Sequence, residues 1–235
     1  MSPSPTSQAA GQAQRAAPSR HALLDQLVAS VTAYVNEHFM DVSGRLVASL
    51  LDLSDSAIDA RSVHQRIKAG NVLKANSYAF FHLVATGLEL AVRKEVDTLL
   101  PPSKPRRLAA SAALSLVPFE EMDSQVAFSA VSRAFEIDYA DALATLNVRL
   151  GFLLERDILR IGQNPFRPEV FLKAIHQAWC EFEPDAESHP LLQPLLKPAI
   201  LFDFGPLYED LNLTLQRKGV LPGSVDNYRI RKSDN

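Results

Sequence analysis

The fold class of this 235-residue chain is decided by residues 118–182, which read PFEEMDSQVAFSAVSRAFEIDYADALATLNVRLGFLLERDILRIGQNPFRPEVFLKAIHQAWCEF. Apolar residues recur every three or four positions in three successive runs, which is the spacing of amphipathic helices. Pro118 suits a first helical turn, and Glu120 and Glu121 complement the positive N-terminal end of a helix dipole. The pattern pauses at residues 136–138, so the first two runs form either two helices or one bent helix.

An elbow is predicted between the second and third runs, at Asn164-Pro165-Phe166-Arg167-Pro168. A residue that precedes proline avoids the helical backbone conformation, so Asn164 and Arg167 are expected to be extended. Pro168 then opens the third helix. Phe166 is expected to pack back against that helix as a hydrophobic staple.

Two long helices are predicted before this stretch. Apolar residues spaced by three and four continue from Leu24 to Leu53, with Gly44 inside the run. A second pattern runs from Ile58 to Leu100, and one long helix kinked near Gly70 is favoured over a break into two helices. Helices of this length form an antiparallel hairpin with little help from the rest of the chain.

The chain is therefore expected to be all-α, with a long N-terminal helical hairpin followed by a compact multi-helix bundle. Composition and proline content divide it into five parts. They are a disordered arm at 1–19, the hairpin at 20–100, a Pro-rich linker at 101–107, the bundle at 108–222 and a flexible tail at 223–235.

Composition also excludes several classes of function. The formal net charge of −3 gives no electrostatic case for binding nucleic acid. No apolar run reaches the roughly 20 residues that a membrane-spanning helix needs, so no membrane insertion is expected. A single cysteine, Cys180, excludes an internal disulfide framework and favours the reducing cytoplasm.

Several motifs resemble, in order, a bacterial family known as domain of unknown function 1631. They are Leu116–Met122, Leu143–Leu150, Asn164–Pro168, Leu201–Asp203, Leu207–Asn212 and Gly219–Pro222. The resemblance implies the N-terminal part of a longer protein or a short stand-alone member. Some members carry a thymidine phosphorylase label. That activity is disfavoured, because the nine glycines are scattered and form no phosphate-binding loop.

No motif for a metal, a cofactor or a catalytic residue stands out. His38, with Glu37 and Asp41 nearby, could be imagined as a metal ligand, but such spacing is far commoner on a solvated helix face. Cys180 follows Trp179 on an apolar face. It is expected to be a buried structural thiol, because no histidine partner is recognised at a suitable spacing.

Arginines in the C-terminal half are the remaining candidates for contacts with a ligand. Arg156 and Arg160 match the Arg-x-x-x-Arg half of a cyclic-dinucleotide signature, whose other half is Asp-x-Ser-x-x-Gly. Asp41-Val42-Ser43-Gly44 imitates that half, but Leu46 stands where the glycine should be. The residues retained as speculative contacts with a ligand or partner are Arg149, Arg156, Arg160 and Asn164.

Three functions are compatible with these features. The favoured one is a non-enzymatic helical scaffold that binds protein, either a partner or further copies of itself as a homo-oligomer. The second is a ligand-responsive regulatory domain, with a pocket between the helices of the C-terminal half and a link to cyclic-dinucleotide signalling. The third, an enzyme such as a phosphorylase, is disfavoured.

Overall fold

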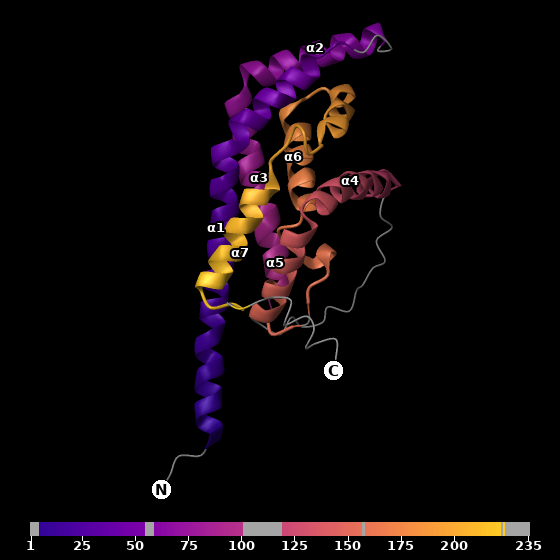
Figure 1. Ribbon diagram of the computed structural model, residues 1–235. Coiled ribbons are helices and arrows are strands. Elements are labelled where there is room, and N and C mark those ends of the chain that lie inside the picture. The colour runs from indigo at the N-terminus through magenta and orange to yellow at the C-terminus, as the bar shows by residue number, and fades with distance from the viewer. Residues whose placement is uncertain (1–4, 55–58, 101–118, 157, 222, 224–235) are drawn as a thin grey trace.

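The computed structural model describes residues 5–54, 59–100, 119–156, 158–221 and 223, with the backbone alone for residues 5–19 and 119–127 (Figure 1). Every regular element in this part of the chain is a helix, so the predicted all-α class is confirmed. The α-helices are α1 (Pro5–Leu51), α2 (Ala60–Ala75), α3 (Ser77–Leu99), α4 (Phe119–Asp138), α5 (Ala140–Leu153), α6 (Pro168–Phe182) and α7 (Phe204–Arg217). Three short 3-10 helices lie between them, η1 (Ile161–Gln163), η2 (Ala186–Leu191) and η3 (Gln193–Leu195). The predicted linker at 101–107 lies outside the described residues, as does the predicted tail except for Gly223.

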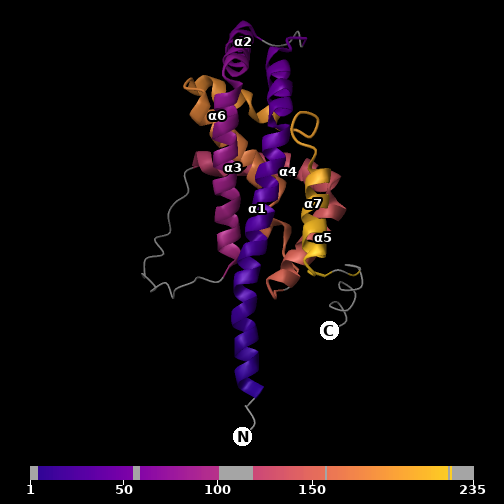
Figure 2. The same ribbon diagram turned by 90° about the vertical axis from the view of Figure 1, so that its left-hand side faces the viewer.

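Helix α1 is 47 residues long, about 70 Å at 1.5 Å per residue. It begins at Pro5, so the prediction of a disordered arm is wrong for residues 5–19. Ala and Gln are the commonest residues of this segment and favour helix, and a helix that already exists is extended at much lower cost than a new one is started. Figures 1 and 2 show this end of α1 extending beyond the other helices.

The second N-terminal segment is two helices, so the prediction of one long helix kinked near Gly70 is wrong. The break lies at Asn76, whose φ of −126° and ψ of 29° leave the helical region. Its side-chain Nδ2 donates to the carbonyl oxygen of Val72 at 3.1 Å. Asparagine is suited to this position because its amide competes with the backbone for helical hydrogen bonds.

Gly70 has a different role, at the packing of α2 against the end of α1. A Cβ atom at this position would lie 2.8 Å from Cδ2 of Leu51 and 3.3 Å from Cβ of Leu50. Carbon atoms in contact are normally about 3.5–4.0 Å apart. The glycine therefore allows close approach of the two helices, rather than a kink.

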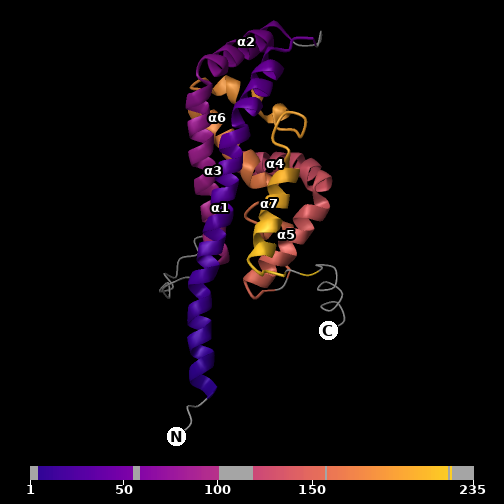
Figure 3. The ribbon, with the colours of Figure 1, turned by 60° about the vertical axis from the view of Figure 1, so that its left-hand side comes forward.

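Helices α1 and α3 run antiparallel and form the predicted hairpin (Figure 3). At one end, Nη1 of Arg93 lies 3.2 Å from Oδ1 of Asp25. Further along, the rings of Phe39 and Phe80 pack with centroids 5.5 Å apart. Residues late in α3 therefore lie beside residues early in α1, as expected for an antiparallel pair.

The bundle packs directly on the hairpin, and apolar side chains of both share one core. Helix α6 lies antiparallel to α3, since Arg167 pairs with Glu95 while the ring of Phe182 lies 5.3 Å from that of Phe80. The indole Nε1 of the fully buried Trp179 donates to the carbonyl oxygen of Ser188 at 3.1 Å. The bundle that was predicted to follow the hairpin therefore covers one side of it.

The two turns of the organising stretch follow from its sequence. Tyr139 separates α4 from α5, so the pause in the apolar pattern marks two helices. At the elbow, Asn164 and Arg167 are extended, with ψ of 119° and 148°, as predicted from the prolines that follow them. Pro168 begins α6, and Phe166 is fully buried beside it.

Candidate functional site

The four residues that the sequence singles out do not converge on one site. Asn164 is fully buried, and its side chain is used by the protein itself. Its Nδ2 donates to Oδ1 of Asn147 at 2.8 Å, and its Oδ1 accepts from the backbone N–H of Phe166 at 2.8 Å. The expectation that Asn164 contacts a ligand is therefore wrong, because its hydrogen bonds hold the elbow against α5.

The three arginines lie in different surroundings. Arg149 is buried between α5 and α7, where its Nη1 donates to the carbonyl oxygen and to Oδ1 of Asn212, at 3.1 and 3.0 Å. Arg156 is exposed and borders a separate cavity of about 340 Å³ beside Arg20. Arg160 is exposed near η1. Of the Arg-x-x-x-Arg pair, Arg156 lines the cavity beside Arg20 and Arg160 does not, and neither lines the cavity that Arg149 borders.

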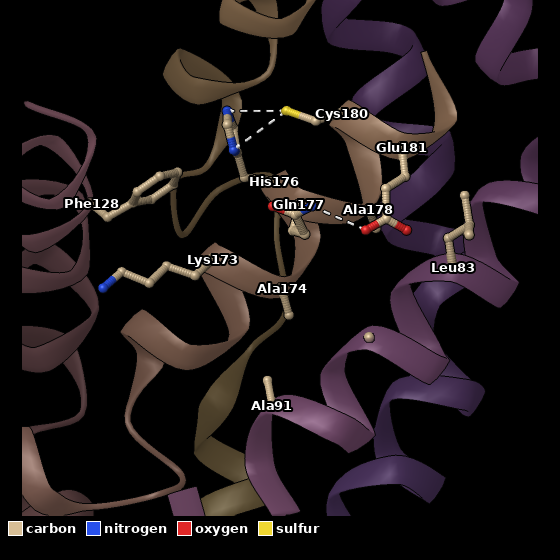
Figure 4. Close-up of a pocket in the computed structure, with 11 residues that line it drawn as sticks. Leu83, Ala91, Phe128, Lys173, Ala174, His176, Gln177, Ala178, Cys180 and Glu181 are labelled. Carbon is tan, nitrogen blue, oxygen red and sulfur yellow. Dashed lines mark hydrogen bonds between the residues drawn. The ribbon is translucent and has the colours of Figure 1, made fainter. Parts of the chain in front are cut away.

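Another cavity lies elsewhere, along the seam between α3 and α6 (Figure 4). Its volume is about 510 Å³. Among the side chains that the structure describes in α4, that of Phe128 lines it. The other lining residues come from α3 and α6 and are Leu83, Gly87, Ala91, Lys173, Ala174, His176, Gln177, Ala178, Cys180 and Glu181. We call this cavity the α3–α6 groove.

The groove is open because the facing side chains are small. Gly87 and Ala91 follow each other by one helical turn on α3, and Ala174 and Ala178 do the same on α6. A Cβ atom built on Gly87 would meet nothing within 4 Å. The buried faces of the same helices carry large residues such as Phe80, so the two helices hold together on their core side and leave a channel on the outer side.

Opposite charges mark the two ends of the groove. Lys173 and Glu181 are eight positions apart on α6, about 12 Å along the helix axis, and Figure 4 shows them at separate ends. Glu181 accepts a hydrogen bond from Nε2 of Gln177 at 3.0 Å, and Lys173 pairs with Glu169. A long ligand lying in the groove would therefore meet a positive end and a negative end.

A cysteine and a histidine line the groove together, a pair that sequence reasoning missed. Sγ of Cys180 lies 3.8 Å from Nδ1 and 4.0 Å from Nε2 of His176. The prediction that no histidine lies at a recognisable spacing is wrong, since positions four apart on a helix share one face. The spacing was readable once α6 was recognised as a helix.

The electrostatics of this pair oppose a catalytic role. Burial raises the pKa of the Cys180 thiol, and the carboxylate of Glu181 raises it further. Burial also lowers the pKa of His176, with a smaller effect from His189. An activated cysteine needs the reverse, a lowered thiol pKa beside a protonated imidazole. The pair is therefore a neutral thiol beside a neutral imidazole, whose ring also packs edge-on against Phe128 at 5.0 Å.

The side chain of His38, which was considered as a metal ligand, packs against its own helix. His38 stacks on Tyr34 with ring centroids 4.2 Å apart, and its Nδ1 lies 2.9 Å from the carbonyl oxygen of the same residue. Among the residues that the structure describes, no three histidine, cysteine, aspartate or glutamate side chains are grouped closely enough to hold a metal ion. Within the same ranges, no helix combines the length and apolar character needed to cross a bilayer.

Comparison with curated proteins and with solved structures found no match to this chain. A family model described as "Protein of unknown function (DUF1631) N-terminal domain" matches residues 19–219. The matched region includes α2 to α7 in full and the part of α1 that packs in the core. The chain belongs to this family, as the order of its sequence motifs suggests.

Proposed function

We propose that this domain is a non-catalytic protein-binding module, and that the α3–α6 groove takes one amphipathic helix of a partner protein. The observation that carries the proposal is the open channel lined by small side chains between two packed helices. Amphipathic helices commonly bind by laying an apolar face into a groove of this kind. Helices pack at axial distances of 8–10 Å when the side chains at the contact allow it.

The surface beside the groove supports a protein occupant. Leu90 follows Gly87 by three positions on α3, and the residue is 66% exposed. A partner helix lying over Gly87 and Ala91 would cover this leucine as well. An exposed apolar side chain at the edge of an apolar channel, with a polar rim beyond it, is typical of an interaction site.

The charges at the ends of the groove define the chemistry of the partner helix. An acidic side chain is expected opposite Lys173 and a basic one opposite Glu181. Because these two residues are about two helical turns apart, the matching charges on the partner should be seven or eight positions apart. Small or apolar residues are expected between them on the same face.

The chemistry of the cysteine and histidine in the groove favours binding over catalysis. The only cysteine has a histidine neighbour, but the pKa directions given above leave neither group activated. The single thiol suits a reducing compartment, so we propose a cytoplasmic location. The end of α1 outside the bundle offers additional surface for assembly.

The proposal can be tested by selecting binders from a displayed library of amphipathic helices. The blocking variant is Gly87→Trp, which places an indole in the groove without a clash at Cβ. The matched control is Gly44→Trp, because Gly44 is also helical and its Cβ direction is equally open. Selected helices should bind the G44W protein like the wild type and the G87W protein at least tenfold more weakly.

A second blocking variant, Leu90→Glu, keeps the test decisive if the G87W protein does not fold. Leu90 is mostly exposed, so a charge there should leave the fold intact while opposing an apolar partner face. Helices that bind G87W, L90E and wild-type protein equally would contradict the proposal. Failure to select any helix from a library that contains the charge spacing given above would also contradict it.

A further inference from the structure

The guanidinium of Arg149 is buried between α5 and α7. The Arg149 residue is 7% exposed, and its only hydrogen bonds among the described residues go to Asn212. Its Nε is buried without a hydrogen-bond partner. No described carboxylate lies within ion-pairing distance of it. Burial of a charged group without a counter-ion is unfavourable, and the two hydrogen bonds to Asn212 offset only part of that cost. An anionic ligand would offset more of it.

This guanidinium borders a cavity of about 480 Å³, which lies in the size range of small-molecule sites. The cavity runs along α5 and α7 and is separate from the α3–α6 groove. Burial lowers the pKa of Arg149. An arginine remains protonated even so, because its ordinary pKa is above 12. A positive group is therefore fixed at one end of the cavity.

The other end of the cavity is negative. Asp141 and Glu209 both line it, and both also line the smaller cavity next to it at the start of α5. Both residues are exposed. Asp141 precedes Arg149 by eight positions, about 12 Å along the helix axis. The arginine side chain leans back toward the N-terminal end of its helix, which shortens the distance between the opposite charges.

The uncharged part of the lining consists of two apolar and two polar residues. Ala142 and Leu213 face the cavity there, and Leu213 is 44% exposed. Thr145 adds one hydroxyl, and Asn212, whose Oδ1 accepts from Arg149, adds a side-chain amide. A ligand that spans the cavity would thus meet carboxylates, then a short apolar surface, then a guanidinium.

We infer that this cavity binds a small zwitterion whose ammonium and carboxylate groups are joined by a chain of several methylenes. The carboxylate would meet Arg149, whose planar fork suits a two-oxygen acceptor. The ammonium would lie near Asp141 and Glu209, and the methylenes would cover Leu213. A ligand with two phosphates, such as a cyclic dinucleotide, is opposed here because the acidic end would repel the second phosphate.

The test uses 6-aminohexanoate as the probe, with calorimetric titration of the full chain. Hexanoate and hexylamine each lack one charged end and are the matched ligands. The zwitterion should bind at least tenfold more tightly than either. Equal binding of hexanoate, equal binding of hexylamine, or no heat with 6-aminohexanoate would each overturn the inference.

Variants locate the binding. Glu209→Gln should weaken 6-aminohexanoate binding several-fold, and Glu37→Gln, an exposed carboxylate on α1, should leave it unchanged. Arg149→Met should remove the preference for the zwitterion over hexylamine. If R149M does not fold, E209Q still decides, since it is exposed and makes no described hydrogen bond. Equal affinity of E209Q, E37Q and wild-type protein would overturn the assignment.

Discussion

Substitution of three helical glycines by alanine should have opposite effects on stability, depending on what each Cβ meets. Gly44 and Gly87 lie within α1 and α3, and a Cβ on either would meet nothing within 4 Å. Alanine favours the helix interior over glycine by about 1 kcal/mol. We therefore expect G44A and G87A to raise the free energy of unfolding by roughly 0.5–1 kcal/mol each.

Gly70→Ala should lower it. The new Cβ would lie 2.8 Å from Cδ2 and 2.9 Å from Cγ of Leu51, which is about 1 Å closer than ordinary contact. Overpacking of this kind costs about 1–3 kcal/mol, and the gain in helix propensity offsets about 1 kcal/mol of that. The net change should be a destabilisation of up to about 2 kcal/mol, because Leu50 limits how far the neighbouring chain can move.

Urea denaturation followed by circular dichroism measures all three variants and the matched background Leu51→Ala. Shortening Leu51 removes the two closest atoms, so G70A should stabilise the L51A protein even though it destabilises the wild type. The reasoning would be refuted if G70A stabilised the wild type as much as G44A does. It would also be refuted if the effect of G70A were the same with and without Leu51, since contacting residues should not be additive.

Three further predictions concern single groups. Burial raises the pKa of the Cys180 thiol, so Cys180 should react slowly with iodoacetamide at pH 7 and faster as the pH rises. A fast, pH-independent rate near pH 7 would indicate an activated thiol and contradict the account. Burial, then the hydrogen bond to Asp203, raises the pKa of Tyr139 to about 12. The stability that Tyr139 contributes is therefore present below pH 10 and lost between pH 10 and 12. In urea titrations, Y139F should lose less stability than the wild type over that interval, and an unchanged loss would contradict this. Trp179→Phe should lower the free energy of unfolding by about 1–3 kcal/mol, because the carbonyl of Ser188 loses its hydrogen-bond donor. A change within about 0.5 kcal/mol would show that this hydrogen bond contributes little.

The parts of the fold that sequence predicts well are those set by local sterics. The elbow at Asn164 to Pro168 is right because each proline restricts the residue before it. The break at Asn76 was missed because glycine was given more weight than asparagine, whereas Gly70 is small for the sake of a neighbouring helix. That reason depends on Leu51, and no local pattern contains it.

The candidate sites depend on tertiary pairing, so the sequence indicates them only in part. The groove exists because α3 and α6, far apart in the chain, pack antiparallel with small residues of both helices along one side of their seam. Arg149 could be chosen from the sequence, but its lack of an acidic partner is visible only once α5 and α7 are placed together. The His176–Cys180 spacing was readable from the sequence, and burial of Cys180 was expected from its apolar surroundings. The burial that lowers the pKa of His176 depends on tertiary packing and was not readable.

The most direct test of the central claim is photo-crosslinking from the groove in the native cells. A p-benzoylphenylalanine at position 90 should form an adduct with one partner protein, at a peptide that is helical and carries the expected charge spacing. The same probe at Ile137, which is 68% exposed on α4, should not form it, and Gly87→Trp should abolish it. Adducts that are equal at positions 90 and 137, that survive G87W, or that join only copies of this chain would contradict the claim that the α3–α6 groove holds a partner's helix.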